Sequence, residues 1–224
     1  MEIVKIKLSL SNAYLVKDKK SILIDTGSPK EANKILSAVK KAGVNEKDIS
    51  LILHTHGHVD HAGSTAALKR RLGIPSAIHK ADAFMLQTGT NGLVNAINFE
   101  AEIYKKILVK PFEASEPDIV IENEMLLNDF GVDGKIIFTP GHTKGSISIL
   151  FANNEMIIGD VMMGGFIGGN LFPSRPTYHY FYNDFDEIKS SIKKIVSLKP
   201  SKMYVGHGGA LTLDDVRKRF SEIL

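Results

Sequence analysis

Four of the eight histidines in the chain fall within one stretch, His54-Thr55-His56-Gly57-His58-Val59-Asp60-His61. Neutral imidazoles bind zinc, iron and manganese-class ions, and carboxylates suit hard divalent ions. The interior of a strand would not have this composition, because burying so many polar groups without partners is costly. His56 and His58 point to the same side of an extended backbone, whereas Asp60 and His61 follow after a turn and can bind a second ion.

Three further segments place a candidate ligand just after a predicted strand, with a glycine beside it. They are Thr139-Pro140-Gly141-His142-Thr143, Ile157-Ile158-Gly159-Asp160 and Tyr204-Val205-Gly206-His207-Gly208-Gly209. Glycine allows the backbone to approach closely. A lone histidine is more often structural than ligating, but the shared position of these ligands at strand ends favours one metal site.

The elements that must position these side chains are short strands interspersed with helices. Alternating apolar and polar residues over Ile3–Leu8 predict a half-buried strand, and the polar run Lys17–Lys20 predicts a hairpin. Further strands are expected over 13–16, 21–24, 49–53, 76–78, 119–121, 135–138, 147–151, 156–158 and 203–205, and helices over 32–42, 64–72, 99–108, 185–198 and 213–220. Strands and helices do not alternate strictly, so two sheets with helices packed outside fit this order.

Two segments of this pattern are less regular. Residues 164–182 read as a glycine-rich and aromatic-rich loop. Residues 88–117 are too long for an ordinary connection, so we expect a lid or a partner surface there. A homodimer is a possibility that the sequence leaves open.

Composition narrows the class of protein. At roughly 150 residues per domain, 224 residues predict one domain with embellishments. The absence of cysteine excludes disulfides, thiolate zinc sites, iron–sulfur clusters and cysteine nucleophiles. Lys and Arg number 28 against 25 Asp and Glu, a balance that does not demand a nucleic-acid partner. Without a signal-peptide pattern or a run of about 18 apolar residues, we expect a cytoplasmic protein with no membrane partner.

These motifs resemble those of the metallo-β-lactamase superfamily of binuclear metal hydrolases. Residues 56–61 match its H-x-H-x-D-H motif, and Pro140–Ser146 match its P-G-H-T-x-G-S segment. Gly159-Asp160, Gly206-His207-Gly208 and Asp25-Thr26-Gly27 match its bridging-carboxylate, last-histidine and early D-T-G segments. The order and spacing agree over nearly the whole chain. The resemblance implies an α/β fold, a four-layered αββα sandwich over residues 1–224, with metals at one edge between the two sheets.

The resemblance also implies the ligand set. One ion is expected on His56, His58 and His142, and a second on Asp60, His61 and His207, with Asp160 bridging the two. Asp25 is expected to orient a ligand through a hydrogen bond, and His54 has no ligand role. Zinc is the expected metal, with iron or manganese as alternatives. We interpret His79 and His179 as surface or structural residues.

The chemistry follows from such a pair of ions. Two ions about 3.5–4 Å apart share a hydroxide and lower its pKa toward ~7, so that it attacks an electrophilic carbonyl or phosphorus. Our hypothesis is that Asp60 accepts a hydrogen bond from the hydroxide and relays its proton. The glyoxalase II-like and lactonase-like branches of the family share this ligand set, whereas true β-lactamases have Cys or Ser at the position of Asp160.

The sequence therefore predicts a hydrolase of a small-molecule acyl substrate, namely an ester, thioester or lactone. Phe166, Tyr178 and Tyr182 of the 164–182 segment are predicted to bind the acyl group, although they could equally pack the second half of the core. Two alternatives stay open, which are a phosphodiesterase or nuclease with the same metals and a non-catalytic metal-binding module.

Overall fold

The computed structural model describes residues 1–92, 94–97, 99–108 and 110–224. Its strands are β1 (Glu2–Lys7), β2 (Asn12–Lys17), β3 (Ser21–Ile24), β4 (Ile49–Leu53), β5 (Ser76–His79), β6 (Ile119–Ile121), β7 (Gly134–Phe138), β8 (Ile147–Phe151), β9 (Glu155–Ile157), β10 (Met163–Phe166), β11 (Leu171–Thr177) and β12 (Lys202–Tyr204). Its α-helices are α1 (Ala32–Lys41), α2 (Val59–Ala62), α3 (Thr65–Leu72), α4 (Ala83–Thr88), α5 (Phe99–Leu108), α6 (Phe185–Ser197) and α7 (Leu213–Arg219). Short 3-10 turns cover Glu46–Asp48 and Asn128–Phe130.

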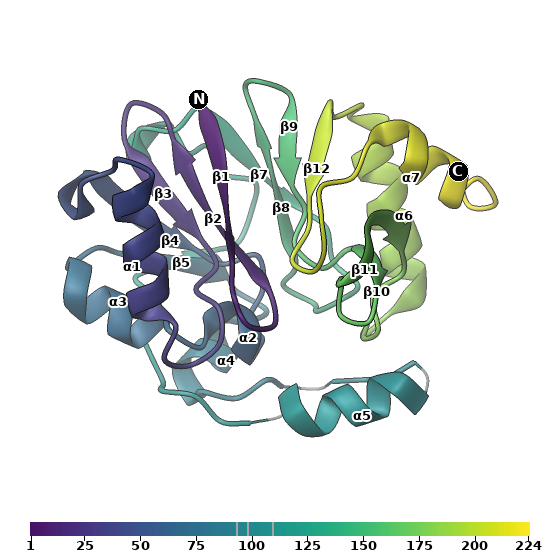
Figure 1. Cartoon of the computed structure of the whole chain (residues 1–224), viewed down its shortest axis with the longest axis horizontal. Helices are drawn as coiled ribbons and strands as arrows, with labels where there is room; N and C mark the ends of the chain where they lie inside the picture. The colour runs from purple at the N-terminus through teal and green to yellow at the C-terminus, as the bar shows by residue number, and fades with distance from the viewer. Residues whose placement is uncertain (93, 98, 109) are drawn as a thin grey trace.

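Two sheets face each other at the centre of the molecule (Figure 1). The first has the order β1-β2-β3-β4-β5-β6, antiparallel from β1 to β3 and parallel from β3 to β6. The second has the order β12-β9-β8-β7. Helices α1 and α3 lie outside the first sheet, and α6 and α7 lie outside the second (Figure 1). This arrangement confirms the four-layered αββα sandwich that the sequence predicts.

Strand β2 shows why the sheets can be covered on both faces. Successive side chains of a strand point to opposite faces of the sheet. Tyr14 and Val16 join the central core between the sheets, whereas Ala13 and Leu15 join the outer core against α1 and α3. All four side chains are buried, so β2 is apolar on both faces.

The outer helix α6 is amphipathic and has a capped N-terminus. In α6, Ile188, Ile192 and Ile195 pack into the core against the second sheet, the spacing of an apolar helical stripe. The side chain of Asp184 accepts hydrogen bonds from the backbone N–H groups of Asp186 and Glu187, which fixes the start of the helix. Among the described residues, no helix combines the length and the apolar composition needed to cross a bilayer.

Part of the predicted 164–182 loop is instead a β-hairpin. Strands β10 and β11 pair antiparallel in a separate two-stranded sheet. Pro173 and Pro176 lie within β11. A proline normally argues against a strand because it cannot donate to the ladder, and it is tolerated here on an edge.

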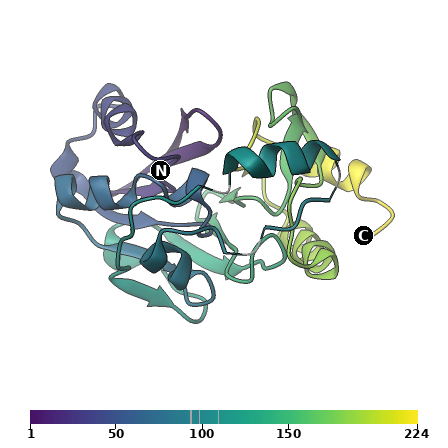
Figure 2. The same ribbon diagram turned by 90° about the horizontal axis from the view of Figure 1, so that it is seen from below.

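The 88–117 segment runs beneath the two sheets and carries α5, as the helical middle of that segment predicts (Figure 2). The backbone N–H of Ile97 donates to the carbonyl oxygen of Tyr180 over 3.2 Å, and Ala96 forms a bridge with Phe181. The described residues of this segment therefore contact the chain that follows β11.

Candidate metal centre

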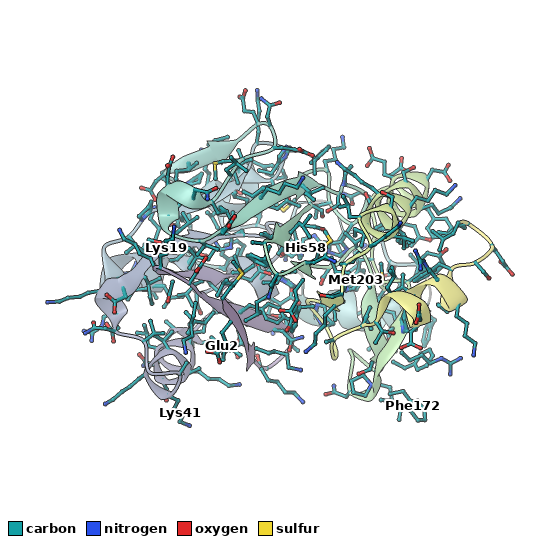
Figure 3. All side chains as sticks on the ribbon, turned by 90° about the horizontal axis from the view of Figure 1, so that it is seen from above. Glu2, Lys19, Lys41, His58, Phe172 and Met203 are labelled. Atoms are coloured by element: carbon teal, nitrogen blue, oxygen red, sulfur yellow. The ribbon has the colours of Figure 1, made fainter. Side chains whose placement is uncertain are left out.

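The predicted ligands converge because four strands end at one edge of the sandwich. Strand β4 leads into the 54–61 stretch, and β7, β9 and β12 end before His142, Asp160 and His207. Strands β9 and β12 run parallel, and β8 is antiparallel to both β7 and β9. Strands β7, β9 and β12 therefore run in the same direction and end on the same side of the sheet. Figure 3 shows His58 near the middle of the molecule, between its two halves.

The seven residues form overlapping groups whose candidate ligand atoms lie within 4.8 Å of one another. One group holds His56, His58 and His142, and another holds Asp60, His61 and His207. Asp160 lies between them, and its Oδ2 is 3.3–3.7 Å from the Nε2 atoms of five histidines. The glycine beside it is needed, because a Cβ on Gly206 would overlap the carboxylate.

The hydrogen bonds of the buried imidazoles test whether this cluster fits metal ions. His142 Nδ1 donates to the carbonyl oxygen of Phe181 over 2.7 Å, and His207 Nδ1 donates to that of Leu10 over 2.9 Å. A carbonyl oxygen only accepts, so the proton lies on Nδ1 and each Nε2 keeps a lone pair that can bind a metal ion. His142 Nε2 lies 3.0 Å from Nδ1 of His58, another predicted ligand of the same ion.

Three buried ligand atoms without hydrogen-bond partners also fit a metal site. His56 Nε2, His58 Nε2 and Asp160 Oδ1 are buried and have no hydrogen-bond partner among the described residues. Buried polar atoms are normally satisfied, so each of these atoms needs an explanation. Imidazole and carboxylate are the usual ligands of zinc and of non-haem iron. The donor set therefore fits divalent metal ions.

Asp25 supports the centre from the turn after β3. Its carboxylate accepts a hydrogen bond from His61 Nδ1 over 2.8 Å, and also from the backbone N–H and the hydroxyl of Thr55. This contact orients His61 and leaves its Nε2 free. Asp25 has a left-handed backbone with a φ of 62°, which aspartate tolerates better than most residues. His54 is fully buried beside it and pairs with the Thr65 hydroxyl, as a residue without a ligand role would.

The carboxylates and imidazoles of the cluster shift each other's pKa values against the effect of burial. Burial would raise the pKa of Asp60, but His61 and His207 hold it well below its usual range. Burial would lower the pKa of His207, but Asp160 and Asp60 raise it to about 10. In the same way, Asp160, Asp60 and Asp25 raise the pKa of His61. Burial lowers the pKa of His56, His58 and His142. His61 and His207 are therefore the imidazoles at which a metal ion would compete with a proton.

A family model described as the metallo-beta-lactamase superfamily matches residues 6–207. The chain belongs to the metallo-β-lactamase superfamily. It is 31% identical over 202 residues to a probable metallo-hydrolase of Methanocaldococcus jannaschii, covering 88% of this chain and 87% of the relative. It is 26% identical over 226 residues to a hydroxyacylglutathione hydrolase of Haemophilus influenzae, covering 97% of this chain and 95% of that protein.

Solved structures agree with this metallo-β-lactamase fold. The B3 metallo-β-lactamase BLEG-1 superposes with a TM-score of 0.74 at 21% identity, covering 99% of both chains. TTHA1623 in a di-iron-bound form superposes with a TM-score of 0.67 at 24% identity, covering 100% of both chains. At such identities the likeness shows the fold alone.

Asp82 is a further residue of this metallo-β-lactamase site that the sequence analysis missed. It is fully buried just after β5. Its carboxylate accepts hydrogen bonds from the backbone N–H groups of Gly57 (3.1 Å) and Gly145 (2.9 Å) and from the Thr143 hydroxyl (2.6 Å). It thereby joins the loop of His56 and His58 to that of His142. A carboxylate just past a strand end is the one sequence signal that could have indicated it.

The interpretation of His179 as a surface or structural residue is wrong in its first part, because the side chain is buried. His179 is 4% exposed, and its Nε2 lies 3.3 Å from Asp160 Oδ2. It forms a fourth candidate group with His142 and Asp160. Isolated in sequence among tyrosines, it matches no family motif. His79, in contrast, is partly exposed and stacks on Phe138, as a structural residue would.

The aromatic residues predicted to bind substrate lie elsewhere. The Tyr178 ring contacts Phe185 and Phe220, and the Tyr182 ring stacks on Phe185, so both belong to the core beside α6. Phe166 is 39% exposed on β10. None of the three is among the described residues that line the cavity next to the cluster. Its walls are Leu10, Met163, Gly168, His179, Tyr180, Phe181 and His207.

Proposed function

We propose that this chain is a binuclear metal-dependent hydrolase that cleaves a small carboxylic ester, thioester or lactone. Membership of the metallo-β-lactamase superfamily supports metal-dependent hydrolysis. Relatives named hydroxyacylglutathione hydrolase, from Haemophilus influenzae and Pelagibacter ubique, support a thioester among the candidate bonds.

One observation carries the choice of an acyl substrate. The cavity beside the cluster has a volume of about 50 Å³, and apolar side chains of Leu10, Met163, Tyr180 and Phe181 form much of its wall. It reaches the centre at His179 and His207. Among the described residues that line it, none is lysine or arginine. Such a cavity suits a short apolar acyl group better than a phosphate, which would require cationic partners.

The residues have distinct roles in this proposal. His56, His58 and His142 would hold one ion, Asp60, His61 and His207 a second, and Asp160 both. When bound, the ions supply Lewis acidity and lower the pKa of a water molecule toward about 7. We propose zinc, with iron or manganese as the alternatives that elemental analysis distinguishes.

Asp60 is the proposed proton acceptor. Its carboxylate stays ionised because His61 and His207 hold its pKa low, and its backbone is fixed by the Ser11 hydroxyl, which donates to the Asp60 carbonyl oxygen. Asp60→Asn keeps the shape and an oxygen that can ligate a metal. We expect this variant to lose rate far more than bound metal. An Asp60→Asn protein with both metals and full rate would show that Asp60 relays no proton.

The deciding experiment compares hydrolysis rates on metal-reconstituted protein. The panel holds an acyl-homoserine lactone, an acyl-glutathione thioester, a simple aryl ester and an aryl phosphodiester, with Asp160→Ala as the blank. Dominant carbonyl hydrolysis supports the proposal and identifies the leaving group. Turnover of the phosphodiester alone refutes it.

Phosphodiester hydrolysis is the second candidate, and one observation favours it. A neighbouring cleft shares Leu10 and Gly168 with the apolar cavity and is also lined by Lys5 and Lys7. These two cations could hold a phosphate, or the anionic part of a thiol leaving group. Loss of only the phosphodiester rate in a Lys5→Ala, Lys7→Ala double variant would favour the phosphate.

A further inference from the structure

His179 faces the metal centre between the two groups of predicted ligands. Its ring centroid lies 4.5 Å from that of His142 and 5.2 Å from that of His207, which belong to different groups. It lines both small cavities beside the cluster, one walled by Leu10 and Tyr180 and the other by Asn91 and Val94. His179 therefore borders the centre from both of these cavities.

The backbone of Phe181 fixes which nitrogen of His179 carries the proton. The Phe181 N–H donates to His179 Nδ1 over 3.2 Å, so Nδ1 accepts and carries no proton. The carbonyl oxygen of Phe181 lies slightly farther from Nδ1, at 3.3 Å, and its shorter hydrogen bond comes from His142, at 2.7 Å, so we assign the N–H of Phe181 as the partner of Nδ1. A neutral imidazole has one donor nitrogen, so the proton lies on Nε2, the atom that faces Asp160.

This tautomer argues against His179 as an eighth metal ligand. A protonated Nε2 has no lone pair to offer a metal ion. To bind metal through Nε2, the ring would have to move its proton to Nδ1, which would then oppose the Phe181 N–H. The same geometry argues against a role as mere filling, because the Nε2–H points at the reacting centre rather than into the apolar core.

We propose that the Nε2–H of His179 is a catalytic hydrogen-bond donor that stabilises the negative charge developing on the carbonyl oxygen of the substrate. The inference rests on the proposed function, since it requires an acyl substrate. The proton remains on Nε2 throughout, and the donor is already oriented by Phe181 before substrate arrives. Removal of one donor of this kind typically lowers kcat by about 100- to 1,000-fold.

The test compares His179→Leu, which has no donor, with His179→Gln, whose amide can donate toward the centre and accept from Phe181. His79→Leu is the matched control, because His79 stacks on Phe138 away from the centre. Each protein is loaded with zinc, its metal stoichiometry and zinc dissociation constant are measured, and kcat and KM are determined on para-nitrophenyl acetate and an acyl-glutathione thioester.

We expect His179→Leu to bind as much metal as the wild-type protein, with kcat lower by about 100-fold or more and KM within about threefold. His179→Gln should recover at least about tenfold of that loss, and His79→Leu should match the wild-type protein. If His179→Leu does not fold, His179→Met serves as the donor-free variant of similar length.

Three results would overturn the inference. Loss of a metal ion in the donor-free variant would make His179 a ligand, and an unchanged kcat would make it a packing residue. A kcat equally low in His179→Gln would mean that donation is not what matters. Wild-type protein that hydrolyses no acyl substrate refutes the proposed function as well, whereas an active wild-type protein matched by His179→Leu refutes this inference alone.

Discussion

Replacing Asp82 by asparagine is expected to loosen two ligand-bearing loops without removing a ligand. Asp82 Oδ2 accepts from Gly57 in one loop and from Thr143 in the other, and Oδ1 accepts from Gly145, which lies in the same loop as Thr143. Asparagine has the same shape but offers only one oxygen. Whichever way its amide turns, one backbone N–H faces an NH₂ group in a buried site, while the Thr143 hydroxyl can rotate to another partner.

The magnitude follows from these contacts. A buried donor left without an acceptor costs about 1–3 kcal/mol, and the remaining hydrogen bonds lose their charge assistance. One effect opposes this loss. Burial raises the pKa of Asp82 despite the hydrogen bonds from Thr143, Gly57 and Gly145, so the ionised carboxylate is less stable in this site than in water. We expect a net destabilisation of about 2 kcal/mol, which for this length lowers Tm by about 4–8 °C.

Metal affinity should fall as well. Residues that orient metal ligands from behind typically contribute about 10- to 100-fold to metal affinity. The loss should be greatest for the ion on His56, His58 and His142, because the hydrogen bonds to Gly57 and Gly145 hold the loops that carry these ligands.

The assay is thermal unfolding of the metal-loaded and metal-free proteins, together with competitive metal titration. Asp186→Asn is the matched control, because Asp186 is an exposed residue of α6 whose carboxylate pairs only with Lys189 among the described residues. The control should change stability by less than about 0.5 kcal/mol. If Asp82→Asn matches this control in both Tm and metal affinity, Asp82 does not hold the loops.

The remaining predictions concern the ions, the protons that they displace and the segment over the site. His142→Ala or Asp160→Ala should each cost at least one bound ion by elemental analysis, and unchanged stoichiometry in both would break the ligand assignment. Metal uptake should release protons and tighten as pH rises from about 6.5 toward about 10, because Asp160 and Asp60 raise the pKa of His207 over that range despite its burial. Because the pKa of His207 is raised on folding, its protonation stabilises the metal-free protein below pH 6.5, and this stability is lost as pH rises through about 10. Denaturant unfolding at several pH values measures this loss. Deleting residues 92–108 should change KM and leave metal content intact if the segment is a lid, whereas loss of folding would make it part of the core.

Local patterns in the sequence predict the two facing sheets and their outer helices. The polar run between β2 and β3 forms the predicted hairpin, and the strands expected over 147–151 and 156–158 pair as β8 and β9, with Asn153-Asn154 in the turn between them. The stripe of Ile188, Ile192 and Ile195 marks the buried face of α6. In each case the signal lies within a short stretch of the chain, where the turn residues or the spacing of apolar residues determine the local structure.

The hairpin of β10 and β11 shows where such signals end. Strand β11 contains Pro173 and Pro176, and strand β10, with which it pairs, is short and rich in glycine. The prolines are tolerated because β11 has a neighbouring strand on one side only within the described chain. Whether a strand lies at the edge of a sheet is a property of the assembled fold rather than of the segment. The same limit explains Tyr178 and Tyr182. Their aromatic character is evident, but only the position of α6 decides that they face Phe185 rather than the cavity.

The sequence indicates Asp82 only weakly and His179 not at all, for a different reason. The partners that define them are backbone N–H groups, those of Gly57 and Gly145 for Asp82 and that of Phe181 for His179. Every residue except proline carries such a group, so the sequence does not indicate which ones are aimed at a side chain. The ligand motif was visible because metal ions require particular side chains in particular numbers. Asp25, which orients His61, could be predicted because it lies in the D-T-G motif, whereas Asp82 and His179 lie in no such motif and are recognisable only once the backbone around them is in place.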